Sequence, residues 1–141
     1  MAVLNDEIRQ QVHDMLADLP HPVRLLVFSK PEECPYCSII EKAPAIAIVG
    51  ERDYGLRFYG IPANYEFSTL LHGIQVAGSG EAAELTPATK SYLAELDQPV
   101  HYQVFVTPTC PYCPGAAVMA YDMAVTSEWV HSDVIEASEF Q

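Results

Sequence analysis

Residues 104–114 read Val-Phe-Val-Thr-Pro-Thr-Cys-Pro-Tyr-Cys-Pro, an apolar segment that runs into a turn and then into a C-x-x-C motif. The same tetrapeptide, Cys-Pro-Tyr-Cys, occurs at residues 34–37 after the apolar run 23–29. These two motifs contain all 4 cysteines of the chain. Two thiols separated by two residues can close a small disulfide ring and open it again, so the sequence points first to dithiol–disulfide chemistry.

The two motifs belong to a longer internal repeat. The apolar run and the proline that precede the first motif recur 77 residues later, before the second motif. The cysteines, the proline and the tyrosine of the motifs then match at an offset of 76 residues. A repeated strand, turn and motif is a more specific signal than either C-x-x-C pair alone.

The composition indicates a folded, acidic protein. Half of the 141 residues are apolar, enough for one domain or two small ones, and the formal net charge of -12 should repel nucleic acid and anionic lipid. The N-terminus lacks the pattern of a signal peptide, and no apolar stretch approaches the roughly 20 residues of a membrane helix. We therefore expect no nucleic-acid or membrane partner and a cytoplasmic location, where C-x-x-C pairs are usually redox-active or metal-binding.

Helical and strand-like patterns alternate along the chain. Asn5 is a predicted N-cap for a helix that ends before Pro20, and the apolar run 23–29 predicts a strand buried on both faces. Met119 and Met123 are expected in the core. The other expected elements are strands at 45–49, 56–60, 101–107 and 129–135, and helices from a cap at Asn64 to about Val76, from Thr86 to about Leu96, and from Cys113 to about Ser127.

A strand that ends in a turn before a helix supplies what a redox dithiol needs. The first cysteine is expected at the helix N-terminus, where the dipole favours a thiolate, and the second about one turn into the helix. Tyr36 and Tyr112 either line the groove beside the thiols or serve in packing. The predicted catalytic residues are therefore the nucleophiles Cys110 and Cys34 and the resolving thiols Cys113 and Cys37.

Four cysteines in two pairs also suit tetrahedral zinc. However, 72 residues separate Cys37 from Cys110, whereas zinc-binding pairs are typically about 12–20 residues apart. We therefore expect no metal, and no cofactor other than the redox-active disulfides, with the electron donor left open. The five histidines show no ligand spacing, and His72 and His101 are expected at the surface or satisfied in the core.

Strand, C-P-Y-C and helix together resemble the opening of the thioredoxin fold, and this tetrapeptide is typical of glutaredoxins. Two such units, at 28–37 and 104–114, resemble the two-unit glutaredoxin-like protein disulfide oxidoreductases of thermophilic archaea and bacteria. Residues 44–50, Pro-Ala-Ile-Ala-Ile-Val-Gly, and 60–62, Gly-Ile-Pro, are similar to the second half of their first unit. The resemblance covers nearly the whole chain. It implies an α/β, thioredoxin-like fold of tandem incomplete units, with a mixed β-sheet flanked by helices.

The resemblance also implies where this chain departs from the family. Residues 1–97 form a first unit without its central strand and helix, and residues 98–141 form only the N-terminal half of a second, so either the protein is shortened or the sequence is incomplete. Pro44 is the implied cis-proline, which presents the Ala43 backbone to a substrate. We expect strand 23–29 beside strand 45–49, with Pro44 near Cys34; the alternative places Pro44 opposite Cys110.

The predicted function is that of an enzyme, a protein disulfide oxidoreductase, with protein thiols or disulfides as substrates. Glutathione and a flavin-linked reductase are both compatible electron donors. We expect the second motif to dominate, because a full-length helix follows it. Two alternatives stay open: a non-catalytic, shortened paralogue whose cysteines bind zinc or an iron–sulfur cluster, and an inactive fragment whose unpaired strand edges promote dimerisation or aggregation.

Overall fold

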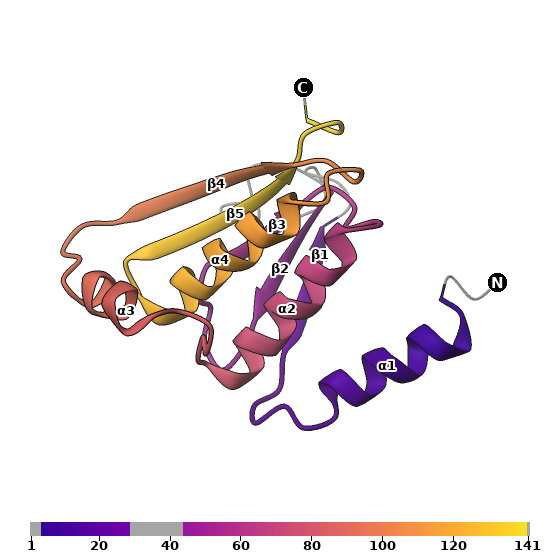
Figure 1. Cartoon of the computed structure of the whole chain (residues 1–141), viewed down its shortest axis with the longest axis horizontal. Helices are drawn as coiled ribbons and strands as arrows, with labels where there is room; N and C mark the ends of the chain where they lie inside the picture. The colour runs from indigo at the N-terminus through magenta and orange to yellow at the C-terminus, as the bar shows by residue number, and fades with distance from the viewer. Residues whose placement is uncertain (1–3, 29–43, 141) are drawn as a thin grey trace.

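A computed structural model of the chain describes residues 4–28 and 44–140. The described part contains a mixed, five-stranded sheet with four helices (Figure 1). Before residue 98 the chain forms α1 (Asp6–Leu16), β1 (Arg24–Phe28), β2 (Ala45–Val49), β3 (Leu56–Tyr59), α2 (Glu66–Ser79) and α3 (Pro87–Ala94). After it come β4 (Val100–Val106), α4 (Cys113–Thr126) and β5 (Val130–Glu136).

The strand order is β1-β2-β3-β5-β4, so strands from before and after residue 98 build one sheet. β1 pairs with β2 and β2 with β3 in antiparallel fashion, whereas β5 is parallel to both β3 and β4. The pairing of β1 with β2 confirms the expected neighbourhood of strands 23–29 and 45–49. The parallel pair β4 and β5 is joined by α4, the crossover helix that such a pair requires.

Two of the three predicted helix caps agree with the structure. The Asn5 side chain accepts a hydrogen bond from the Ile8 N–H (2.8 Å), and the Thr86 hydroxyl accepts one from the Thr89 N–H (3.2 Å), with a proline in the first turn that follows. The predicted cap at Asn64 is wrong. This residue has a φ of 52°, in the left-handed region that asparagine tolerates better than most residues, and α2 begins two residues later.

The main core lies between one face of the sheet and helices α2 and α4, which cover that face in Figure 1. Gly73 of α2 makes this close approach possible: a Cβ at this position would lie 2.6 Å from Ile48 Cδ1 and 3.1 Å from the Tyr121 ring. The ring is fully buried, and its hydroxyl donates a 2.8 Å hydrogen bond to the Arg57 carbonyl. The core also contains Phe58, Val106, Ala117, Ala124 and Val134.

Two expectations about burial are wrong. β1 is exposed along most of its length, with Val27 69 % exposed, because it is the outermost strand of the described sheet rather than an interior one. Met119 is 57 % exposed, since the side of α4 that carries it faces away from the core, whereas Met123 packs against the core as expected. No helix in residues 4–28 and 44–140 is long and apolar enough to cross a membrane.

Candidate functional site

The second C-x-x-C motif lies between the end of β4 and the start of α4. Cys110 and Cys113 form a disulfide, with their Cα atoms 5.5 Å apart. The Cys110 N–H donates a 3.1 Å hydrogen bond to the Thr107 carbonyl, which fixes the turn that leaves the strand. α4 begins at Cys113, so this cysteine is the first helical residue and does not lie one turn inside the helix as expected. Both cysteines are partly buried, and Cys113 packs against the main core.

Three exposed aromatic or apolar residues lie between or near the two cysteines along the sequence. Tyr112, between the two cysteines, is 87 % exposed and therefore packs against little of the protein. Phe105, at the end of β4, and Met119, on α4, are also exposed. Isolated surface apolar groups are ordinary in folded proteins, but these three lie within a few residues of the two cysteines along the chain.

An open pocket lies beside the turn that leads to Cys110. Its volume is about 520 Å³, and Asn64, Tyr65, Pro108 and Thr109 line it. The pocket therefore joins the segment before α2 to the residues immediately before the cysteine. Pockets of this size accommodate small ligands or side chains of a larger substrate.

Glu66, directly after the pocket residue Tyr65, is a buried acidic residue in the first turn of α2. Glu66 has no exposed surface, and its Oε2 accepts a 2.8 Å hydrogen bond from the Thr69 hydroxyl. Its Oε1 has no hydrogen-bond partner among the residues that the structure describes. Burial raises the pKa of Glu66 because a carboxylate loses its hydration there, and the bond from Thr69 opposes this effect only in part.

Of the other predicted site residues, only Pro44 lies in the part of the chain that the structure describes. Cys34, Tyr36, Cys37 and Ala43 lie outside the described residues. Pro44 comes directly before β2, and its carbonyl accepts a 2.8 Å hydrogen bond from the Gly60 N–H.

Pro44 was expected near Cys34, with a position opposite Cys110 as the alternative, and β2, which follows Pro44, has a defined place in the sheet. β2 and β4 are separated by β3 and β5, so these two strands, which Pro44 precedes and Cys110 follows, are about 14 Å apart at the usual spacing. The pairing of β1 with β2 is the one on which the expected arrangement rests. Because Cys34 lies outside the described residues, the proximity of Pro44 to Cys34 stays a prediction.

Comparison with solved structures identifies the fold. The N-terminal NTD_N/C domain of the alkyl hydroperoxide reductase AhpF from Enterococcus faecalis superposes with a TM-score of 0.81 at 20 % sequence identity, covering 97 % of this chain and 82 % of that one. A protein disulfide oxidoreductase from Aeropyrum pernix superposes with a TM-score of 0.80 at 24 % identity, covering 99 % and 78 %. The chain has a thioredoxin-like fold.

Sequence comparison agrees with this thioredoxin-like assignment. The alkyl hydroperoxide reductase AhpF of Staphylococcus epidermidis is 24 % identical over 160 aligned positions, which cover 99 % of this chain and 31 % of the relative. The AhpF of Staphylococcus aureus is 22 % identical over 139 positions, covering 97 % and 26 %. The chain is homologous to these proteins but spans only between a quarter and a third of their length. No family model matches it.

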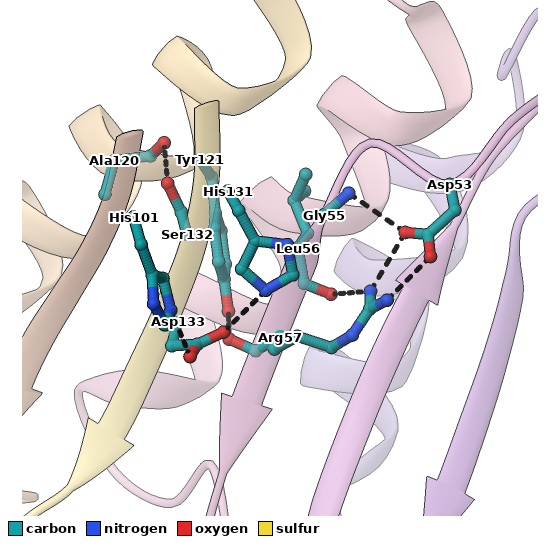
Figure 2. Close-up of polar contacts among 10 residues, drawn as sticks. All are labelled: Asp53, Gly55, Leu56, Arg57, His101, Ala120, Tyr121, His131, Ser132 and Asp133. Carbon is teal, nitrogen blue, oxygen red and sulfur yellow. Dashed lines mark hydrogen bonds and ion pairs between the residues drawn. The ribbon is translucent and has the colours of Figure 1, made fainter. Parts of the chain in front are cut away.

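The thioredoxin-like sheet also brings together polar side chains that the sequence reasoning did not connect (Figure 2). His101 Nε2 lies 2.6 Å from Asp133 Oδ2, and His131 Nε2 lies 3.0 Å from Asp133 Oδ1. His101 is therefore a part-exposed, hydrogen-bonded residue, in line with the expectation for it, and these three side chains form a group that the spacing along the sequence did not indicate. Part of this grouping can be read from the sequence. His131 and Asp133 are two residues apart on one predicted strand and so share a face, and His101 begins the strand predicted before the crossover helix.

A second polar pair lies next to this group. The Arg57 side chain is buried and donates to both carboxylate oxygens of Asp53, at 2.9 and 2.6 Å. Burial alone raises the pKa of Asp53, but the hydrogen bonds from Arg57 and from the Gly55 N–H, with the nearby positive charge, outweigh burial and lower it below its ordinary value. On the opposite face, burial raises the pKa of Tyr121 well above its ordinary range, so its hydroxyl stays a hydrogen-bond donor.

Proposed function

We propose that this chain is a thiol–disulfide oxidoreductase that acts on protein disulfides through its C-P-Y-C dithiols. The observation that carries the proposal is the Cys110–Cys113 disulfide between β4 and α4 of a thioredoxin-like fold, beside an open pocket and exposed aromatic side chains. The homologous A. pernix protein is itself a protein disulfide oxidoreductase.

The proposed reaction uses the two cysteines in sequence. In the reduced protein, the Cys110 thiolate attacks one sulfur of a substrate disulfide and forms a mixed disulfide, and the other substrate sulfur leaves as a thiolate that takes up a proton. The Cys113 thiolate then attacks the Cys110 sulfur and releases the second substrate thiolate. The substrate disulfide gains two electrons, and the protein loses two by forming the Cys110–Cys113 bond.

The assignment of Cys110 as the nucleophile follows from its position. Cys110 precedes the first residue of α4, where the free N–H groups of the helix end favour a thiolate, whereas Cys113 packs against the core. We propose the same roles for Cys34 and Cys37 in the first motif. Tyr112 and Tyr65 offer apolar surface to a protein substrate on either side of the turn at Pro108 and Thr109.

The partners belong to the same proposal. Glutathione or a flavin-linked reductase would return electrons to the disulfides, and the cytoplasm is the compartment in which dithiols of this kind are kept reduced. The names of the homologous staphylococcal proteins add components of an alkyl hydroperoxide reductase to the protein substrates to be tried.

An insulin reduction assay with dithiothreitol as the donor tests the proposal. We expect C110S to lose most of the activity, C34S to lose less, and C34S/C110S to be inactive. C37S and C113S keep the proposed nucleophiles but lack the resolving thiols, so each should stall its motif at the mixed disulfide. Unchanged activity in C34S/C110S would overturn the proposal.

A further inference from the structure

Two imidazoles converge on one carboxylate at the β4–β5 edge of the sheet. In Figure 2 the rings of His101 and His131 both point at the carboxylate of Asp133, one at each oxygen. The two rings are 5.1 Å apart between their centroids and inclined at 75°. One ligand atom from each of the three residues lies within 4.8 Å of those of the other two.

Strand pairing fixes this arrangement. His101 and His131 are direct neighbours in the parallel register of β4 and β5, and Asp133 lies two residues further along β5. Because side chains alternate between the faces of a strand, all three project from the same face. The Asp133 side chain is 6 % exposed, whereas the two imidazoles are 45 % and 41 % exposed. The carboxylate is therefore at the bottom of the group and the imidazoles at its solvent side.

The surroundings suit a cation. Arg57 is opposite Asp133 in the β3–β5 register, but its guanidinium is held by both oxygens of Asp53 and points away from the histidines in Figure 2. The carboxylate of Asp133 is therefore left to the two imidazoles. The imidazoles line a pocket of about 300 Å³, which connects the group to solvent. The acidic surface of the chain, with a formal charge of -12, raises the local concentration of cations.

We propose that His101, His131 and Asp133 form a binding site for Zn²⁺. Imidazole nitrogen and carboxylate oxygen are ordinary zinc ligands, and three protein ligands leave the fourth tetrahedral position for a water from the pocket. Zinc bonds of about 2.0–2.1 Å require ligand atoms roughly 3.3 Å apart. The nitrogen–oxygen distances of 2.6 and 3.0 Å run to different oxygens of Asp133 and are shorter than that value, and the three ligand atoms all lie within 4.8 Å of one another, so small side-chain rotations are needed to fit the ion. For the ion to bind at Nε2, the single proton of each neutral ring moves from Nε2 to Nδ1.

Zinc titration of the full, untagged chain tests the site. All four cysteines are first oxidised, because free thiolates would bind zinc themselves. With zinc chloride as the probe, calorimetry and elemental analysis should show one ion per chain. H101Q and H131Q should each weaken binding at least about tenfold, since even loss of a residue that only supports a ligand costs 10–100-fold. H72N is the matched control, because His72 makes a similar 2.6 Å contact with the buried Asp122 but has a single imidazole.

A measurement on the unchanged protein guards against misfolded variants. Zinc should shift the imidazole NMR signals of His101 and His131 and leave those of His13, His21 and His72 in place. Zinc that binds H101Q and H131Q as tightly as the parent overturns the proposal. So does binding below one ion per chain at micromolar free zinc, and so do shifts confined to the other three histidines.

Discussion

The contact of α2 with α4 and the sheet predicts opposite effects for the same substitution at two helical glycines. At Gly73, a Cβ would lie 2.6 Å from Ile48 Cδ1 and 3.1 Å from the buried Tyr121 ring. At Gly115, two residues after Cys113 in α4, nothing lies within 4 Å of an added Cβ. Both residues are inside helices, so both substitutions to alanine gain the same helix propensity, about 0.5–1 kcal/mol.

The difference between the two variants therefore isolates the packing effect. Overpacking a well-filled core typically costs about 1–3 kcal/mol. We expect G115A to raise the free energy of unfolding by about 0.5–1 kcal/mol. We expect G73A to change it by about 0 to -2.5 kcal/mol, because the far end of the Ile48 side chain can move but the fully buried Tyr121 ring has little room.

Urea unfolding of the parent, G73A and G115A, all with oxidised cysteines, measures these values. The change in midpoint should be accompanied by an unchanged m-value if the compactness of both states is preserved. A G73A variant as stable as G115A would refute the packing of α2 against Tyr121 and Ile48. Equal destabilisation by both substitutions would refute the open environment assigned to Gly115.

Two further predictions concern buried charge. The pKa of Glu66 is raised in the folded state, so the folded protein binds more protons than the unfolded chain and its stability falls as pH rises from the ordinary glutamic acid value through the raised one. E66Q should remove this fall and be more stable than the parent at neutral pH in urea unfolding; a parallel pH dependence in both proteins would contradict the assignment. The pKa of Asp53 is lowered in the folded state. Its contribution to the free energy of unfolding is therefore present above the ordinary aspartic acid pKa and is lost as the pH falls through the lowered one. D53N should cost about 1.5–3 kcal/mol at pH 7, because it weakens the pairing of the buried Arg57, and the cost should shrink in acid.

Local sequence signals predicted most of the elements. Caps at Asn5 and Thr86 and the apolar runs that became β2 to β5 carry their information within a few residues, and the structure has these elements close to their expected bounds. The start of α2 was predicted from Asn64 because asparagine is a common capping residue. Asn64 instead has a left-handed backbone, a conformation that depends on the chain on both sides of it and not on residue type alone.

Features that depend on the whole sheet were harder to predict. The run that forms β1 reads as a buried strand, but its exposure is decided by its place at the end of the strand order. The convergence of His101, His131 and Asp133 depends on the register of β4 and β5, which no spacing along the sequence states directly. The C-x-x-C pair at Cys110 was predictable because its residues are close in sequence and its chemistry is local.

Trapping of a mixed disulfide tests the central claim, disulfide exchange at Cys110, most directly. In a C34S/C37S background, C113S retains the proposed nucleophile but lacks the thiol that resolves the intermediate, and C110S retains only the partner that packs against the core. After reaction with insulin, mass spectrometry should find an insulin chain linked covalently to Cys110 in the C113S protein and little adduct in the C110S protein. Adducts of equal yield at Cys113, or none in either protein, would contradict the account.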